Sequence, residues 1–373
     1  MSARMLKLLA VALLGWLVAG SVGILVLAFC YAVLRPLALE EADKHGISTD
    51  SASRMGGSVV VLFMGITVLP QLLFSTAVLN SALVIVFVVV VALYSLGVAE
   101  DMGARLPASL RLFCILLVVG SAFYALNLDK TLSAVWPGIM PLQGVYFAAL
   151  ILVVLAGFFI NSFNTADGAN GLVAGTTIIF LAATLEQFGL QASLAPLWLS
   201  AALGAGLFFI VNVVVGRFFL GDGGAYALGG IVVLSLWFAL QSQPNAVLPL
   251  LCLVLYPITD LSFSAARRLL AGRSPMAADN RHLHNLLYHY WRRSLNSGVA
   301  NSVTGLTIVA LFSGSGYLLR AAPAEILVLL VLLQALGYSA LWFLLDTQSR
   351  KRIARPAAKA APARLAAANI VNY

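Results

Sequence analysis

The amino-acid sequence predicts an all-α polytopic membrane protein with about eleven transmembrane helices. Of the 373 residues, 61% are hydrophobic and 10% are charged, and the mean hydropathy is +0.99; in water-soluble domains about a quarter of residues are charged. Long uncharged runs follow one another along the chain. They consist of continuous Leu, Val, Ile and Ala without the alternation typical of membrane strands, so we expect helices to satisfy the backbone in lipid.

A run of about 20 apolar residues is needed to cross the hydrocarbon core of a bilayer. The runs that approach this length are 8–33, 59–79, 82–98, 112–126, 142–160, 172–188, 194–215, 226–240, 246–263, 303–319 and 326–345. The first is too long for the core of a signal peptide and no small-residue cleavage pattern follows it, so we interpret it as a retained helix.

The distribution of basic residues predicts the orientation. If the loop after the first span is cytoplasmic, all but four of the 22 Lys and Arg residues lie inside, the exceptions being Arg4, Lys7, Lys130 and Arg320. Basic residues favour the cytoplasmic side, which puts the N-terminus outside and the C-terminus inside. Residues 1–346 then form a single integral-membrane catalytic domain, and 347–373 form a basic, Ala/Pro-rich cytoplasmic tail that we expect to be disordered. The predicted cytoplasmic loops are 34–58, 99–111, 161–171, 216–225 and 264–302.

The net charge of +8 is explained by this orientation and by attraction to anionic lipid headgroups, and it needs no nucleic acid partner. The three cysteines lie within or beside apolar runs without paired spacing, so we interpret them as core residues rather than as a metal site or disulfide.

Acidic residues are scarce, and four odd-numbered spans bring them to the cytoplasmic face. Glu100 and Asp101 end the third span, Asp167 follows the fifth, Asp222 follows the seventh, and Asp260 lies near the end of the ninth. Carboxylates at membrane depth are usually functional or paired. For Asp260 a solvated position is an equally good interpretation.

Two of these carboxylates lie in turns rich in Gly and Asn, at 161–172 and 219–224. Glycine allows backbone N–H groups to approach an anion closely, and a carboxylate can hold a divalent cation that bridges to phosphate oxygens. The pattern therefore indicates nucleotide-phosphate chemistry. It is neither a Walker A loop nor a dinucleotide fingerprint.

The longest predicted loop is strongly basic, and basic charge opposite carboxylates suits a pyrophosphate held between a metal and cations. Its basic residues are Arg267, Arg268, Arg273, Arg281, His282, His284, His289, Arg292 and Arg293. His282 and His284 are also spaced as a zinc pair can be, although no Cys lies near them. His289 and His45 are interpreted as ordinary loop residues.

Taken in order, five motifs resemble those of the polyprenyl-phosphate N-acetylhexosamine-1-phosphate transferases, the family of the peptidoglycan translocase and of the enzymes that start O-antigen and teichoic acid lipid intermediates. They are Arg54-Met-Gly-Gly57, Glu100-Asp101, the segment from Asn161 to Leu172, the segment from Asn212 to Gly224, and Asp279-Asn-Arg-His-Leu-His284. The eleven spans and the cytoplasmic tail resemble the O-antigen initiating branch most.

The resemblance implies a site and a reaction. Its expected catalytic residues are Asp101, Glu100, Asp167, Asp222, His282 and His284; its expected substrate-binding residues are Arg54, Asn161, Asn164, Asn170, Asn212 and Arg281; and its metal ligands are Asp222 and Asp101, for Mg²⁺ or Mn²⁺. The partners implied are a UDP-sugar, a polyprenyl phosphate and the lipid bilayer, with the chain alone or as a homodimer. The implied location is the bacterial inner membrane, with the site on the cytoplasmic face. The lipid phosphate would attack the β-phosphorus and release UMP, directly or through a phosphorylated Asp.

The chain departs from the family pattern at a few positions. Glu100 replaces the first Asp of a pair, Asn170 replaces the second Asp of an Asp-Gly-x-Asp-Gly motif, Asn280 precedes Arg281, and Asn285 stands where a further His is common. Glu100 keeps its charge, whereas Asn170 removes one. Two other functions stay open: a transporter or flippase of a lipid-linked or anionic solute, and a binding relative without catalysis. Transporters concentrate polar groups near the bilayer midplane, whereas here they gather at one face.

Overall fold

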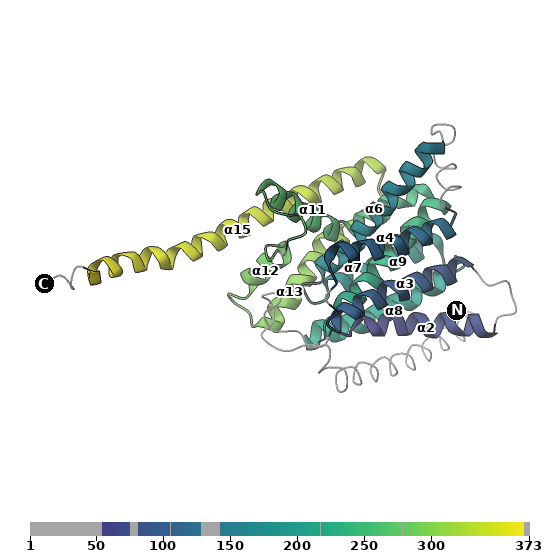
Figure 1. Cartoon of the computed structure of the whole chain (residues 1–373), viewed down its shortest axis with the longest axis horizontal. Coiled ribbons are helices and arrows are strands. Elements are labelled where there is room, and N and C mark those ends of the chain that lie inside the picture. Colours follow the sequence, from purple (N-terminus) through teal and green to yellow (C-terminus); the bar gives the residue numbers. More distant parts are fainter. Residues whose placement is uncertain are drawn as a thin grey trace.

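The computed structural model of the chain describes residues 54–74, 81–104, 106–127, 142–216, 218–277 and 279–368. The first predicted span, 8–33, lies outside these residues. The described part is helical, without strands. Most of its helices run alongside one another as a bundle, and the C-terminal helix extends beyond it (Figure 1). The structure thus agrees with the predicted all-α class.

The helices of the bundle mostly begin and end near the predicted boundaries. They are α2 (Gly57–Phe74), α3 (Ser81–Asp101), α4 (Ala108–Ala125), α6 (Leu142–Ala166), α7 (Leu172–Phe188), α8 (Ala195–Val215), α9 (Gly221–Ser242), η2 (Pro244–Ala246), α10 (Val247–Leu253), α11 (Leu255–Leu270), α12 (Leu283–Trp291), α13 (Ser297–Val309), the π-helical turn η3 (Ala310–Gly314), α14 (Ser315–Leu319) and α15 (Ala324–Ala368).

Seven helical segments in the described residues are long and apolar enough to cross a membrane, and an eighth is added if the bent pair α10 and α11 counts as one span. Two shorter apolar segments, Gly57–Val68 and Leu172–Phe188, fall below that length. The chain is therefore consistent with a polytopic membrane protein. The total of eleven spans and the orientation of the termini stay predictions.

The ninth predicted span, 246–263, is not one continuous helix. α10 ends at Leu253 and α11 begins at Leu255, with a 69° bend between the two segments. Pro257, in the first turn of α11, has no N–H to donate to the carbonyl of Leu253, and its ring crowds that carbonyl, which is why the helix breaks here. The apolar run alone did not reveal this break.

The centre of the bundle is α9, which packs against α2, α3, α6 and α7. Small residues in its first turns allow this close packing: a side chain on Gly223 would overlap α3 at Val98, and one on Gly224 would overlap α2 at Gly57. The Gly-Asp-Gly-Gly motif is consequently the start of a buried helix rather than an open turn.

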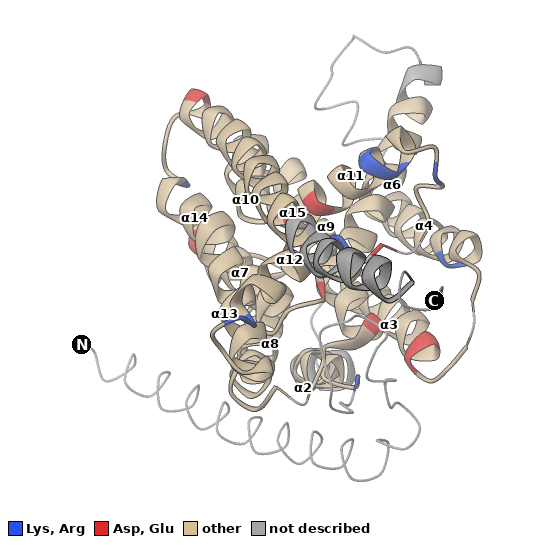
Figure 2. Cartoon of the chain, turned by 90° about the vertical axis from the view of Figure 1, so that its left-hand side faces the viewer, with Lys and Arg blue, Asp and Glu red and all other residues tan. Residues whose placement is uncertain are grey.

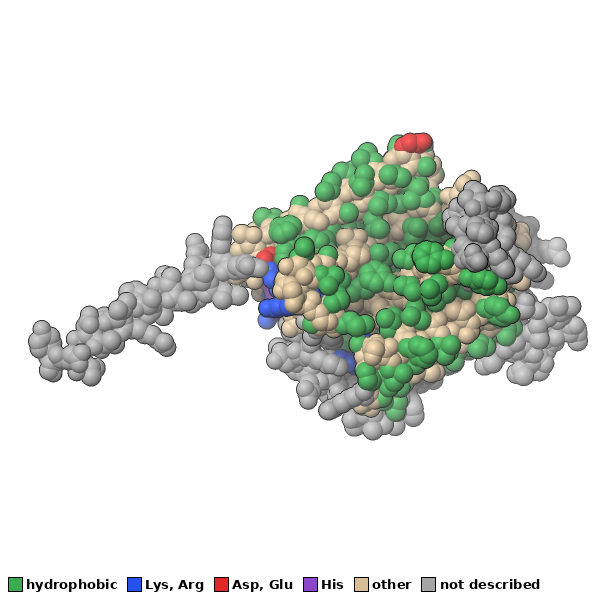
Figure 3. Space-filling model, turned by 45° about the horizontal axis from the view of Figure 1, so that its top comes forward, with side chains coloured by type: hydrophobic (Ala, Val, Ile, Leu, Met, Phe, Trp, Pro, Cys, Tyr) green, Lys and Arg blue, Asp and Glu red, His purple; other side chains and the backbone are tan. Residues whose placement is uncertain are grey.

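The outer surface of the bundle is largely apolar, as a bilayer requires. The face shown in Figure 3 is covered largely by hydrophobic side chains, and Lys and Arg side chains appear near the place where α15 leaves the bundle. Figure 2 looks at this end of the molecule and shows charged residues around the helix ends. The backbone of the segment expected to be a disordered tail continues α15 as a helix as far as Ala368.

Candidate active site

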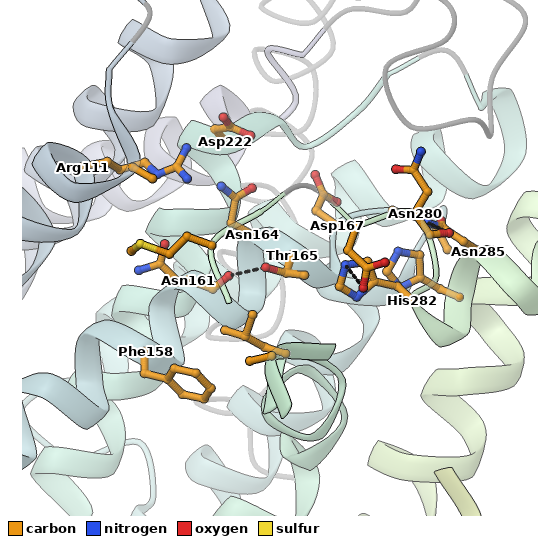
Figure 4. Close-up of a pocket in the computed structure, with 18 of the residues that line it drawn as sticks. Arg111, Phe158, Asn161, Asn164, Thr165, Asp167, Asp222, Asn280, His282 and Asn285 are labelled. Atoms are coloured by element: carbon orange, nitrogen blue, oxygen red, sulfur yellow. Dashed lines mark hydrogen bonds and ion pairs between the residues drawn. The ribbon is translucent and has the colours of Figure 1, made fainter. Parts of the chain in front are cut away.

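A cavity of about 700 Å³ opens among the ends of α4, α6 and α11, the start of α9, the loop before α12, and α12 itself. Nine of the twelve predicted site residues line it: Arg54, Asn161, Asn164, Asp167, Asn170, Asn212, Asp222, His282 and His284. Arg111 and Asp222 lie on one side in Figure 4, His282 and Asn285 lie on the other, and Asn164 and Asp167 lie between them. The predicted residues from distant motifs therefore share one site.

The Asn-rich motif begins on α6 rather than in a loop. Asn161, Asn164 and Thr165 lie in its last turns, where residues three or four apart share a face. Asn164 Nδ2 donates to the hydroxyl of Tyr226 on α9 at 3.0 Å. Asn161 Nδ2 donates to the carbonyl of Gly157 at 2.9 Å. The end of α6 thus presents amide groups along the floor of the cavity.

Asp101 is bound to the N-terminus of α9. Its Oδ1 and Oδ2 accept hydrogen bonds from the backbone N–H groups of Asp222 and Gly223, each at 3.1 Å, and Arg54 Nη1 lies 3.6 Å from Oδ1. Gly221 precedes these donors with φ of 78°, and a side chain there would overlap the carbonyl of Arg54 and the Asp101 carboxylate. The anion that approaches the glycines of this motif is therefore Asp101, which does not line the cavity.

Asp222 and Glu100 form the acidic side of the site. Asp222 lies in the first turn of α9 and lines the cavity, and the Glu100 carboxyl lies beside it. Glu100 accepts hydrogen bonds from Arg111 Nη1 at 3.0 and 3.3 Å. Arg111 lines the cavity from α4. Glu100 does not line the cavity, so it affects the cavity through its contacts with Arg111 and Asp222.

Asn170 and Asn212 are buried and hold the loop after α6 against α8 and α13. Asn212 Oδ1 accepts from the N–H of Gly171 at 2.6 Å, and its Nδ2 donates to the carbonyl of Phe218 at 2.6 Å. Asn170 Nδ2 donates to Ser302 Oγ at 3.3 Å. Both amides line the cavity, but these contacts show that they also tie its walls together.

The histidine side of the cavity is built around His282, the N-cap residue of α12. Burial lowers the pKa of His282, but the carboxylates of Asp260 and Asp279 raise it more, so its pKa lies above the ordinary value. Burial raises the pKa of Asp279, whereas hydrogen bonds from Ser264 and the Arg281 N–H, with the nearby charges of His282 and Arg267, bring it below the ordinary value. Both residues therefore favour their charged forms.

His284 lies one residue beyond the start of α12, and its ring stacks parallel to that of His282, with centroids 5.4 Å apart. Its Nε2 packs against Gly168, where a side chain would overlap the ring. The second residue of the Asp-Gly motif is thus small because an imidazole from another helix occupies the space beside it.

Arg281 does not line the cavity, and its predicted role in binding stays a prediction. Its Nε donates to Asp346 Oδ1 on α15 at 3.0 Å, and its guanidinium lies 5.1 Å from the centre of the Trp342 ring. Trp342 Nε1 also donates to the carbonyl of Arg281 at 2.7 Å. The charge of Asp346 and the aromatic face of Trp342 turn Arg281 toward α15, away from the cavity.

Several residues of the site were not predicted. Arg111 and Arg268 line the cavity; from the sequence, Arg111 is expected only to orient the chain, and Arg268 only to belong to the basic loop that suits a pyrophosphate. Asn285 also lines it, and its Oδ1 is buried without a hydrogen-bond partner among the described residues. An Arg at the start of an apolar run, where it faces a carboxylate of the preceding span, is the signal that could have identified Arg111.

The residues present fit a divalent cation of the kind expected. Two neighbouring carboxylates, Asp222 and Glu100, face one Arg, and Mg²⁺ is commonly held by one or two carboxylates together with substrate phosphates. Within the part of the chain that the structure describes, no group of three or more His, Cys, Asp or Glu residues is placed to hold a metal ion by itself.

Known proteins with similar sequences match this same region. The model of glycosyl transferase family 4 matches residues 82–240, which run from the first turn of α3 to the last turn of α9 and include the acidic side of the cavity. Over this region the chain is similar to glycosyl transferase family 4. The predicted resemblance is thereby confirmed at the level of the family.

Three curated relatives show how far the likeness extends. The undecaprenyl-phosphate α-N-acetylglucosaminyl 1-phosphate transferase of Escherichia coli (strain K12) is 33% identical over 151 residues, 38% of this chain and 40% of the relative. The protein of the same name from Yersinia pestis is 30% identical over 189 residues, 48% of this chain and 51% of the relative. A probable undecaprenyl-phosphate N-acetylglucosaminyl 1-phosphate transferase of Bacillus subtilis (strain 168) is 24% identical over 300 residues, 76% of this chain and 78% of the relative. The chain thus spans only about half or less of the length of the first two relatives.

Proposed function

We propose that the chain transfers an N-acetylhexosamine 1-phosphate from a UDP-sugar to a polyprenyl phosphate, giving a polyprenyl-diphosphate sugar and UMP. The observation that carries this proposal is the single cavity with Asp222 on one side and His282 and His284 on the other (Figure 4). The names of the relatives supply the first substrates to test, undecaprenyl phosphate and UDP-N-acetylglucosamine.

In the reaction, an oxygen of the lipid phosphate attacks the β-phosphorus of the UDP-sugar. A new P–O bond forms, the bond between the β-phosphorus and the bridging oxygen breaks, and UMP leaves with that oxygen. Phosphoryl transfer of this kind depends mainly on positioning and on neutralising charge. The basic side chains that line the cavity are suited to that task; they are Arg54, Arg111, Arg268, His282 and His284.

The residues at and beside the cavity have different proposed roles, according to where they lie. Asp222, with Glu100 beside it, would hold Mg²⁺ or Mn²⁺, which when bound would neutralise pyrophosphate oxygens. His282 and His284 would donate to phosphate or sugar oxygens. The amides of Asn161 and Asn164 and the buried Oδ1 of Asn285 would bind the nucleotide or the sugar. Asp101 would act through Asp222, whose backbone it binds.

We place the protein in the bacterial cytoplasmic membrane, with the cavity at the cytoplasmic face where nucleotide sugars are made. Its product would start a cell-envelope glycan such as an O-antigen. The chain would act alone or as a homodimer. The ion pair between Arg320 and Glu186 lies at the end of α7 away from the cavity, and it would lie at the opposite face of the membrane.

The decisive experiment supplies the purified chain with UDP-N-acetylglucosamine, undecaprenyl phosphate and a Mg²⁺ series, and measures the nucleotide released. We expect UMP together with the lipid-linked sugar phosphate. Asp222→Asn keeps the shape of the side chain and removes its charge, so we expect turnover to fall about 100-fold or more while the protein stays folded.

Glu186→Gln is the matched control, because it removes a carboxylate at the far end of α7 and should leave turnover near that of the wild type. Release of UDP would indicate glycosyl transfer and contradict the proposal. Solute flux across vesicles without any UMP would support the transporter instead. Full turnover by a well-folded Asp222→Asn protein at low Mg²⁺ would remove Asp222 from the mechanism.

A further inference from the structure

Behind the histidine side of the cavity lies the carboxylate of Asp260, on α11, with a side chain only 1% exposed. It accepts hydrogen bonds from His282 Nδ1 at 2.6 Å, from the hydroxyl of Tyr338 at 2.8 Å and from the N–H of Leu283 at 3.1 Å. We infer that Asp260 is a positioning residue, whose carboxylate sets the orientation of His282 so that Nε2 of its ring is presented to a phosphate oxygen in the cavity. This inference rests on the proposed function and assigns Asp260 a positioning role within the proposed active site.

The contact with His282 determines which nitrogen is presented. A carboxylate only accepts hydrogen bonds, so Nδ1 of His282 must keep its proton. Nε2 lies on the opposite side of the ring, 4.0 Å from Oδ2 of Asp279, and both Asp279 and His282 line the cavity. Asp260 therefore directs Nε2 of His282 to the side where a ligand binds.

His284 is connected to the same carboxylate through Tyr256. The Tyr256 hydroxyl donates to Asp260 Oδ1 at 3.5 Å and lies 3.1 Å from His284 Nδ1. Because Nε2 of His284 packs against Gly168, His284 supports the ring of His282, and His282 supplies the Nε2 that faces the cavity. The two rings are parallel within 5°, as expected of side chains held by one buried group.

Charge supports the same role. His282 faces Asp260 and Arg268 from α11, Asp279 from the preceding loop and His284 from α12, while Tyr338 contacts Asp260 from α15. Burial and the charge of Arg268 lower the pKa of His282, but the carboxylates of Asp260 and Asp279 raise it by more. A protonated imidazole with its Nε2–H in the cavity would make a charge-assisted hydrogen bond to a phosphate oxygen.

The first test uses the pH profile of UMP release. A raised pKa means that protonated His282 is present at low pH and is lost as pH rises through that pKa, so wild-type kcat/KM should fall there. Asp260→Asn removes the charge, and the fall should move to lower pH, with kcat/KM reduced about 10- to 100-fold, as when the residue that orients a functional imidazole is changed. Asp346→Asn is the matched control: it removes another carboxylate that binds the same loop, and it should leave the pH of the fall unchanged.

The second test asks whether Asp260 acts through His282. If it does, Asp260→Asn combined with His282→Gln should be no less active than His282→Gln alone. Losses that multiply, or an Asp260→Asn variant whose alkaline fall stays at the wild-type pH, would overturn the inference. Wild-type protein that releases no UMP would instead contradict the proposed function, and the third test would still apply.

The third test needs no Asp260 variant to fold. Histidine labelled with ¹⁵N in the wild-type protein, with His282 assigned by loss of its signals in His282→Gln, reports which ring nitrogen is protonated. We expect a protonated Nδ1, and full protonation persisting above the pH at which an unperturbed histidine titrates. A neutral ring protonated on Nε2 would overturn the inference whatever the kinetics show.

Discussion

Asn170 is one of the residues at which the chain departs from the pattern of the family that it resembles, and its neighbours explain the departure. Ser302 Oγ donates its only proton to the carbonyl of Val213 at 2.8 Å, so it accepts from Asn170 Nδ2. Asn212 Nδ2 lies 3.4 Å from Asn170 Oδ1. An amide, which both donates and accepts, satisfies this pair of neighbours, whereas a carboxylate has no proton for Ser302.

Asn170→Asp should accordingly destabilise the protein. The site is 3% exposed, so a carboxylate there would be buried against an oxygen lone pair, at a cost of about 1–3 kcal/mol. We expect a lower midpoint of thermal unfolding in detergent. Ser302→Ala removes the opposing oxygen, so the double variant should lose less than the two single variants together. A midpoint equal to that of the wild type in Asn170→Asp would show that Ser302 can turn to donate without loss.

At the scale of the helix, α9 depends on a cap supplied by another helix. Its first N–H groups have no partners within the helix, and Asp101 at the end of α3 accepts two of them. A negatively charged carboxylate is also stabilised by the positive, N-terminal end of a helix dipole. Asp101 therefore joins α3 to α9 and fixes the turn that carries Asp222. This arrangement gives Asp101 a role in stability besides the metal ligation that the resemblance predicts.

Asp101→Asn separates the two roles. One amide oxygen cannot accept both N–H groups as two carboxylate oxygens do, so we expect stability to fall by about 1–2 kcal/mol. If capping is the main role, the Mg²⁺ concentration for half-maximal UMP release should stay near the wild-type value. Glu325→Gln, the same change in the exposed first turn of α15, is the control and should be nearly neutral. A large rise in the Mg²⁺ requirement with an unchanged unfolding midpoint would restore Asp101 as a ligand.

Apolar run length predicted the described helices well, because a lipid-exposed helix needs a continuous run of that length. α7 has the predicted bounds, 172–188. The break between α10 and α11 was missed, since a search for apolar length gives no weight to one proline. The motifs predicted as loops are partly helix ends, because α6 and α9 continue into them, and hydropathy alone does not place a helix end within a Gly- and Asn-rich segment.

Most of the candidate site was predicted because its residues carry family motifs, and the helix ends bring these together. The position of Arg281 outside the cavity lining was not predicted, because it depends on Asp346, 65 residues further along the chain, which no local pattern reveals. Asp260 was left undecided for the same reason: its partners His282 and Tyr338 come from two other helices. Tertiary contacts of this kind distinguish a residue that binds substrate from a residue that positions a substrate-binding side chain.

At the scale of the whole molecule, the predicted orientation puts the cavity in the cytoplasm. Cysteine labelling in intact cells tests this, after the native cysteines are replaced. A Cys at Met276, an exposed residue at the cavity, should not react with a probe confined to the outside, whereas a Cys at Leu190, exposed beyond the far end of α7, should react. Labelling at Met276 alone would invert the topology and move the site to the other face.

The attachment of Arg281 to Asp346 and Trp342 has a mechanical consequence. The histidines belong to a unit made of α11, α12 and the long α15, tied together by Asp260, Tyr338 and Arg281, whereas Asp222 belongs to the unit formed by α3 and α9. The width of the cavity is therefore the separation between two helical units. A displacement of α15 would therefore be passed to the loop and helix that carry the imidazoles, and α6, which packs against both α11 and α9, lies between that unit and Asp222.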